Sequence, residues 1–388
     1  MIRVRHGVWD RAQHSLWRRA LVNATLILTG CVTGAPTALA FGAFPPIVPV
    51  PADNPMTPAK IALGKQLFFD PRLSISGAIS CDTCHNVASN GTDNLPLSFG
   101  VFGRVDTPVN APTVFNAAFN TVQFWDGRAA SLEAQAKGPI TSRNEMGMPN
   151  GTAVVKRLDK IPGYRREFGR VFGGTNAITF NRVTDAIATY ERTLIIPDSP
   201  YDRFVKGDQS ALSRSAVTGM VLVRSMGCTT CHAGPMFDNP GVPMGTGWYQ
   251  KFPKNPQYGV CAMYIAKYHL KGNLGRFLIT HNPAQIDFFK VPGWRNVALT
   301  APYFSYGTVK TLPNAVRVEA ACQLEETVST RQVDAIVAFL DSLTGVFPQE
   351  ILPHLPETPN TTILMGVPRL TRIAERGSKE QGGNSGQQ

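Results

Sequence analysis

The chain has 388 residues, of which 43% are hydrophobic and 17% are charged. This is the composition of a globular protein, so a buried core is expected. No uninterrupted apolar run reaches about 18 residues, which argues against a membrane-spanning helix in the mature protein. The net charge of +11 is not gathered in a basic run with interleaved aromatic residues, so nucleic acid is not an expected partner.

Residues 1–40 are typical of an export signal. An arginine pair ending at Arg19 precedes the short apolar stretch of residues 20–28, and Ala-Leu-Ala at residues 38–40 forms a cleavage site. Cys31 closes a Leu-Thr-Gly-Cys sequence that resembles the lipidation site of bacterial lipoproteins. The sequence therefore allows cleavage either after residue 40 or before Cys31. We expect a mature periplasmic protein, either free or anchored by a lipid on Cys31.

Helical periodicity recurs along the rest of the chain. Thr57 followed by Pro58 predicts a helix start, and several stretches repeat apolar residues at helical spacing. These faces are Leu63, Leu67 and Phe68; Val154, Leu158 and Ile161; Val183, Ile187, Tyr190 and Leu194, with Asn181 as cap; and Val333, Val337 and Leu340, with Thr330 as cap and Gly345 as stop. Because alternating strand patterns are scarce, the predicted fold class is all-α.

A Cys-x-x-Cys-His motif occurs twice. Two thiols at this spacing reach the two vinyl groups of one haem, and the adjacent histidine supplies the proximal nitrogen to the iron. The predicted attachment residues are Cys81, Cys84 and His85, and then Cys228, Cys231 and His232.

Two other readings of the motifs fit less well. The half-motifs of a zinc site usually lie within about 12–20 residues of each other, far closer than these two motifs. A redox-active dithiol does not explain a histidine after both motifs. We therefore predict two covalently bound haem c groups, one in a domain of residues 41–200 and one in a domain of residues 201–345. The tail of residues 346–388 is rich in proline and then in polar residues, and is expected to be flexible.

The sequence around the motifs resembles the bacterial di-haem cytochrome c peroxidases, a family that includes the MauG branch. The resemblance covers residues 45–345 and is most specific at residues 67–74, 112–116, 123–128, 289–292 and 295–304. It implies two cytochrome c-like haem domains with long loops and little β structure.

The resemblance also implies a division of labour. The N-terminal haem meets hydrogen peroxide, and the C-terminal haem accepts electrons from a small cytochrome or cupredoxin. Trp125 matches the tryptophan between the haems, while Gln135 and Glu145, with Pro139 beside them, match the polar pair on the peroxide side. Such a pair is chemically sensible because cleavage of the O–O bond requires a proton to move from the inner to the outer oxygen. Without the resemblance, Glu145 would be read as a surface carboxylate and Trp125 as core.

A calcium ion is a further implication of the resemblance. The matched ligands are Asn110 and the backbone oxygens of Thr300 and Pro302, and hard oxygen ligands suit calcium. The alternative is that these three residues are ordinary turn residues that bind no metal.

The first departure from the family concerns the peroxide-side haem. Its relatives carry a second histidine ligand in the loop after the first motif. Here that loop, residues 98–103, reads Ser-Phe-Gly-Val-Phe-Gly, and no histidine lies between His85 and His232. We expect this iron to be five-coordinate or water-bound at rest, so that reductive activation is unnecessary.

The second departure concerns the electron-transfer haem. Relatives supply a methionine, or in MauG a tyrosine, at a position that falls here on Glu319. A carboxylate ligand would lower the reduction potential relative to a thioether. Tyr306, His269, His281 or a cysteine are the alternative ligands, and a surface role for Glu319 is its main competitor.

Cys261 and Cys322 are left over in an oxidising compartment. A disulfide between them is the leading interpretation. Free thiols, or thiolate ligation by Cys322, are the alternatives.

Three functions follow from the sequence. The first is a peroxidase that reduces hydrogen peroxide with electrons from a small redox protein. The second is a MauG-like enzyme that uses peroxide to oxidise residues of a partner protein. The third is a di-haem electron carrier without enzymatic activity, which the Gln135 and Glu145 pair argues against. The sequence does not distinguish a monomer from a homodimer.

Overall fold

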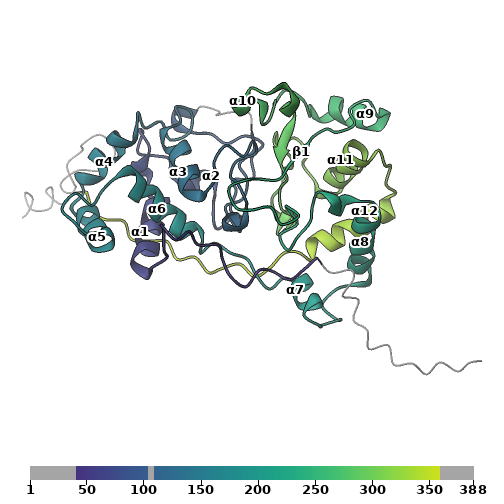
Figure 1. The fold of residues 1–388 in the computed structure, drawn as a ribbon, viewed down its shortest axis with the longest axis horizontal. Helices are drawn as coiled ribbons and strands as arrows, with labels where there is room; N and C mark the ends of the chain where they lie inside the picture. Colours follow the sequence, from purple (N-terminus) through teal and green to yellow (C-terminus); the bar gives the residue numbers. More distant parts are fainter. Residues whose placement is uncertain (1–40, 104–108, 359–388) are drawn as a thin grey trace, which may run out of the picture. The chain divides into compact units, whose positions relative to one another are not determined.

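The computed structural model describes residues 41–103 and 109–358. The predicted export signal of residues 1–40, with Cys31, and the tail from residue 359 lie outside the described residues. The predicted fold class is confirmed, because the described chain is mostly helical. Its strands β1 (Tyr249–Lys251) and β2 (Phe288–Lys290) pair antiparallel, with Gln250 opposite Phe289 (Figure 1). No helix in these ranges is long and apolar enough to cross a membrane.

Most buried apolar side chains fall into two clusters, one drawn from residues 63–196 and the other from residues 201–343. We call these parts of the chain the first and second halves; their status as separate domains stays a prediction. The first half contains α1 (Pro58–Phe69), α2 (Cys81–Cys84), α3 (Leu132–Thr141), α4 (Gly151–Asp159), α5 (Pro162–Phe172) and α6 (Phe180–Glu191). The second contains α7 (Pro200–Val205), α8 (Arg214–Ser225), α9 (Gly259–Tyr268), α10 (Phe277–Thr280), α11 (Leu312–Leu324) and α12 (Thr330–Asp341).

The same helix contact recurs in both halves. α1 packs on α6, and α8 packs on α12. At each contact a glycine lets the backbones approach: a Cβ atom on Gly64 would overlap the carbonyl oxygen of Ala186, and one on Gly219 would overlap that of Ala335. In each half, the first helix of this pair precedes the haem attachment motif. The repeat seen in the motifs therefore extends to the packing around them.

Helix starts agree only partly with the sequence. Thr57 caps α1 by accepting a hydrogen bond from the Lys60 amide, as predicted. The other two predicted caps are wrong, because Thr179 caps α6 and Ser329 caps α12. Hydroxyl side chains thus stand just before both predicted caps and accept the amide hydrogen bonds. α12 ends at Asp341, before the predicted stop at Gly345.

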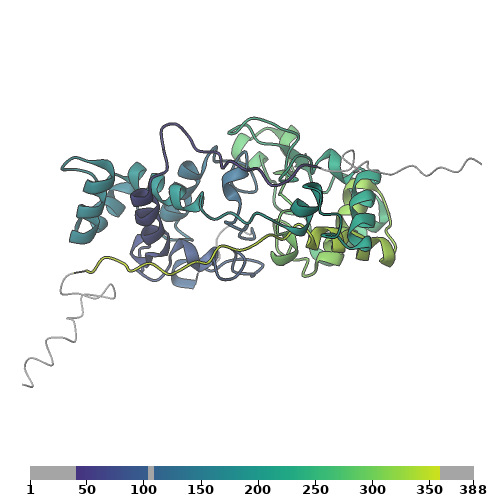
Figure 2. The ribbon, with the colours of Figure 1, turned by 90° about the horizontal axis from the view of Figure 1, so that it is seen from below.

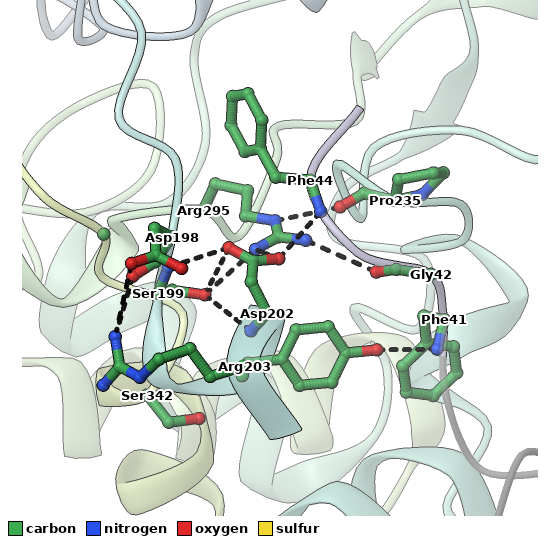
Figure 3. A network of polar contacts seen from close by, with 12 residues as sticks. Phe41, Gly42, Phe44, Asp198, Ser199, Asp202, Arg203, Pro235, Arg295 and Ser342 are labelled. Carbon is green, nitrogen blue, oxygen red and sulfur yellow. Dashed lines mark hydrogen bonds and ion pairs between the residues drawn. The ribbon is translucent and has the colours of Figure 1, made fainter. Parts of the chain in front are cut away.

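A buried ion pair joins distant parts of the second half (Figure 3). The Arg295 guanidinium lies 2.8 Å from the Asp202 carboxylate, and both side chains are almost fully buried. Asp202 also accepts a hydrogen bond from the Phe44 amide, and Arg295 donates to the carbonyl of Pro235. The pair therefore holds four segments together: the entering chain, the start of α7, the loop after the second haem motif, and the loop that carries Arg295 itself.

The segment that follows the second half returns to the first. Glu350 forms a 2.6 Å ion pair with Lys65 of α1, and the carbonyl of Pro356 accepts a hydrogen bond from Arg72. Residues 347–358, which we expected to be flexible, are thus packed against the first half. In Figure 2 this segment (yellow) and the entering chain (purple) each extend from one group of helices to the other.

Candidate active site

Two cavities adjoin the two attachment motifs. The first, of about 250 Å³, is lined by Cys84 and His85. The second, of about 270 Å³, is lined by Cys228, Cys231 and His232. The two cavities share several lining residues: Asn110, Ala111, Pro112, Thr113, Asn120, Trp125, Phe289 and Lys290. The sites for the two predicted haems are therefore neighbours with a common wall.

His85 is oriented as an iron ligand. It follows α2 directly, and its Nδ1 lies 3.0 Å from the carbonyl oxygen of Pro112. A carbonyl only accepts hydrogen bonds, so the ring carries its proton on Nδ1 and leaves the Nε2 lone pair available. Burial lowers the pKa of His85, which favours the neutral imidazole that binds a metal.

His232 shows the same arrangement in the second half. Its Nδ1 lies 3.1 Å from the carbonyl oxygen of Phe237. The ring stacks on Trp294 with 4.4 Å between the ring centroids, and Trp248 donates a hydrogen bond to the Cys231 carbonyl. The second motif thus offers two sulfurs and a fixed imidazole at the edge of its cavity. The first motif offers the Cys84 sulfur and a fixed imidazole, with Cys81 packed against the core beside them. This donor set fits covalent haem.

The predicted polar pair lies on the first cavity. Gln135 and Pro139 stand one turn apart on α3, and both line this cavity together with Glu145. After α3 the chain turns back, because the Met146 amide bonds to the carbonyl of Pro139. This turn brings Glu145 to the same wall as Gln135. The structure therefore brings together the three residues that the sequence singled out.

The loop that departs from the family borders the same cavity. Ser98 and Gly100 line it, and the amide of Val101 donates a 2.7 Å hydrogen bond to the carbonyl of Glu145. His85 is the one histidine among the residues that line the first cavity. In relatives this loop is expected to supply a histidine ligand. Here it holds the backbone of Glu145 instead.

Trp125 belongs to the shared wall. Its indole nitrogen donates a 2.9 Å hydrogen bond to the carbonyl of Asn110, and its own carbonyl accepts from the amide of Lys290. The first bond fixes the ring, and the second fixes the backbone that carries it. The placement agrees with the position that the resemblance implied.

Glu319 lies in the second cavity, opposite His232. Its Oε1 is 3.9 Å from the Nε2 of His232. Burial raises the pKa of the Cys228 thiol to about 12, and the nearby Glu319 charge adds to this effect.

The alternative ligands named from the sequence lie elsewhere. His269 and His281 are exposed at the ends of α9 and α10. The Tyr306 hydroxyl accepts a hydrogen bond from the Asn273 amide and does not line the second cavity. Cys322 forms a disulfide with Cys261, which settles the pairing of these two cysteines.

Comparison with known proteins identifies the family of this chain. The family model for di-haem cytochrome c peroxidase matches residues 58–210. A cytochrome c551 peroxidase of Nitrosomonas europaea is 42% identical over 82% of this chain and 89% of its own length. The chain belongs to the di-haem cytochrome c peroxidase family.

Both branches of the di-haem peroxidases are represented among the relatives. A cytochrome c551 peroxidase of Pseudomonas aeruginosa is 41% identical over 80% of this chain and 85% of its own length. The methylamine utilization protein MauG of Methylorubrum extorquens is 36% identical over 80% and 86%. A crystal structure of a MauG-like protein associated with microbial copper homeostasis aligns with a TM-score of 0.65, at 28% identity, over 81% of this chain and 98% of the other.

The calcium ligands implied for a di-haem peroxidase lie around one cavity. Asn110, Thr300 and Pro302 all line the second cavity. The amide of Asn110 donates a 2.7 Å hydrogen bond to the carbonyl of Ser305, which holds the two loops together. The three residues therefore line the same cavity, and calcium binding there stays a prediction.

Sequence reasoning missed two charged residues of this di-haem peroxidase. Lys290 lines both cavities, and burial lowers the pKa of its amine. Glu191 lines the first cavity, is 6% exposed, and has one carboxylate oxygen without a hydrogen-bond partner. A signal for Glu191 was present, because it stands four residues after Ile187 on the apolar face of α6.

Proposed function

We propose that this di-haem peroxidase reduces hydrogen peroxide to two molecules of water in the first cavity, taking two electrons and two protons in each turnover. The observation that carries the proposal is that Glu145 and Gln135 line the same cavity as His85. The electrons come from a small cytochrome c or cupredoxin through the second haem. Family membership itself makes the chain a peroxidase-type oxidoreductase.

When bound, haem would supply the redox-active iron for peroxide reduction and a route for electrons. The residues of the chain supply the proton chemistry. Glu145 moves a proton from the inner to the outer oxygen of peroxide, and the Gln135 amide orients peroxide by hydrogen bonding. His85 would hold the iron through the nitrogen that its bond to Pro112 leaves free. Trp125, on the wall shared by both cavities, lies on the route of the electrons.

Steady-state kinetics test this function. The purified holoprotein is given hydrogen peroxide with a reduced small cytochrome c, and separately with a reduced cupredoxin. We expect two donor molecules to be oxidised for each peroxide consumed. Absence of donor oxidation with both donors would contradict the proposal.

A MauG-like reaction on a partner protein is the second candidate. Two features favour it: the described residues that line the first cavity include no second histidine, and the Glu319 carboxylate lines the second cavity. In this case peroxide without a donor would produce a long-lived oxidised form of the protein. Mass spectrometry of a co-purifying partner would then show oxidised tryptophan or tyrosine after peroxide treatment.

The resting state of the first haem follows from the same cavity. With His85 as its one histidine, we propose a five-coordinate or water-bound iron that needs no reductive activation. The fully oxidised protein should then react with peroxide at once, and its EPR spectrum should contain a high-spin ferric signal. A spectrum of two low-spin haems, one with two histidine ligands, would contradict this.

We propose further that one calcium ion is bound by Asn110, Thr300 and Pro302. The proposal is supported by the position of all three residues on one cavity. Elemental analysis should find one calcium per chain, and the Asn110→Ala variant should lose it.

We also propose export to the periplasm by residues 1–40, supported by their composition. N-terminal sequencing of the mature protein should begin at Phe41, or show a lipid-modified Cys31. Light scattering will distinguish a monomer from a homodimer.

A further inference from the structure

Glu319 and His232 face each other across the second cavity. Oε1 of Glu319 and Nε2 of His232 are 3.9 Å apart, which is too long for a hydrogen bond. Nδ1 of His232 points to the carbonyl of Phe237, so in the neutral ring Nε2 carries a lone pair and no proton. In that state the lone pair and the carboxylate oxygen repel each other unless a cation lies between them, whereas a proton on Nε2 would make the contact a long ion pair.

The separation fits one metal ion. First-row metals bind an imidazole nitrogen and a carboxylate oxygen at about 2.0–2.2 Å each. Two such bonds on opposite sides of a metal would span roughly 4 Å, close to the distance from His232 to Glu319. The same cavity is lined by the two cysteines that attach the second haem.

Glu319 is carried by a well-packed helix. It lies in the middle of α11, whose neighbouring residues Val318 and Cys322 are fully buried. Cys322 is bonded to Cys261 of α9, so a covalent link joins these two helices. A ligand on a braced helix keeps its geometry better than one on a loop.

Other side chains of the cavity are poorer candidates. Met226 and Met236 line it, but they stand two residues before Cys228 and four residues after His232, on the segment that carries the proximal ligand. Asp238 lies on the same segment and accepts a hydrogen bond from Asn239.

We propose that Glu319 is the sixth ligand of the second haem iron, opposite His232. The inference deepens the proposed function, because it specifies the haem that accepts electrons. A filled sixth position keeps peroxide away from this iron. An anionic oxygen ligand also stabilises ferric iron and lowers the reduction potential relative to methionine ligation.

Variants of the holoprotein at residue 319 test the assignment. In the wild type, we expect a six-coordinate second haem that does not bind added imidazole. Glu319→Ala opens the position, so imidazole binds and the EPR signal of this haem changes. Glu319→Met supplies a thioether, so the potential of the second haem rises and a near-infrared sulfur-to-iron band appears.

Glu326→Gln is the matched control, because Glu326 is an exposed glutamate just beyond α11 that lines neither cavity. It should leave the EPR spectrum and potential unchanged. Haem content and far-UV circular dichroism establish that each variant is folded. If Glu319→Ala does not fold, the gain of a thioether signature in Glu319→Met carries the test.

Two results would overturn the assignment. One is an EPR spectrum and potential of the second haem that stay at the wild-type values in both Glu319 variants. The other is a wild-type thioether band that disappears in Met226→Leu or Met236→Leu. Peroxide turnover is measured on the same wild-type sample, and its absence would contradict the proposed function without changing the ligand assignment.

Discussion

The indole nitrogen of Trp125 donates a 2.9 Å hydrogen bond to the backbone carbonyl of Asn110, and both residues line both cavities. The bond fixes the one tryptophan that the described residues place on the shared wall. An aromatic ring held at a fixed angle between two redox centres is suited to electron transfer between them. In the proposed electron route, the loop of Asn110 has the role of holding the ring.

Trp125→Phe should slow electron transfer from the second haem to the first. The variant keeps an aromatic ring but loses the N–H donor, and leaving the Asn110 carbonyl unpaired should cost about 1–3 kcal/mol of stability. Stopped-flow reduction by donor, followed by peroxide, measures the transfer. Tyr249→Phe is the control, because Tyr249 bonds to Gly127 of the same loop but lines neither cavity. Equal transfer rates in the two variants would exclude this role.

Glu145→Gln should lower peroxide turnover by about 10²–10⁴-fold, the usual contribution of a general acid–base group. The amide keeps the size of the side chain but cannot move a proton. Asp159→Asn neutralises an exposed carboxylate of the same half outside the cavity and should leave turnover unchanged. Steady-state rates with a saturating donor decide the matter, and near wild-type turnover in Glu145→Gln would refute the assignment.

Arg295→Met should destabilise the protein by about 3–5 kcal/mol, since it leaves the Asp202 carboxylate buried without a cation. Arg203→Met is the matched control (Figure 3). Arg203 forms an exposed 3.8 Å pair with Asp198, whose loss should cost less than about 1 kcal/mol. Urea unfolding followed by circular dichroism compares the two. A similar loss in both variants would show that burial of the Arg295 pair is unimportant.

Much of the site was predictable because its signals are local. Each attachment motif spans five residues, and Gln135, Pro139 and Glu145 lie within one helix and the turn after it. The predicted fold class needed only helical periodicity. Helix caps were less certain, since neighbouring hydroxyl and amide side chains near a helix start can accept the same amide hydrogen bonds.

The residues that orient the site were not predictable in this way. The carbonyl of Pro112 holds His85 from 27 positions away, and Asp202 pairs with Arg295 across 93 positions. Such contacts depend on how loops pack, and loops carry no periodic signal. The packing of residues 347–358 on the first half was missed for the same reason, because their proline-rich composition is also that of a flexible tail.

Replacing Cys261 and Cys322 together by alanine should destabilise the protein. The disulfide closes a loop with a sequence separation of 61, for which the chain-entropy model gives about 4 kcal/mol. Because Cys322 is on α11, the EPR signal of the second haem should also broaden. Unfolding of the oxidised wild type and of the double variant measures the loss. A double variant as stable as the wild type, with an unchanged signal, would contradict both expectations.

Glu191 should make stability depend on pH. Burial raises the pKa of its carboxyl from 4.5 to about 8, while the nearby Arg192 charge opposes the rise. The folded state therefore binds this proton more tightly than the unfolded state does. The resulting stabilisation is fully present below pH 4.5 and is lost as the pH rises towards about 8.

Glu191→Gln cannot titrate, so its stability relative to the wild type should increase across this window. Urea unfolding of both proteins at several pH values tests the prediction, with the exposed Glu326→Gln as control. If the difference between wild type and Glu191→Gln is the same at every pH, the carboxyl of Glu191 does not titrate with a raised pKa.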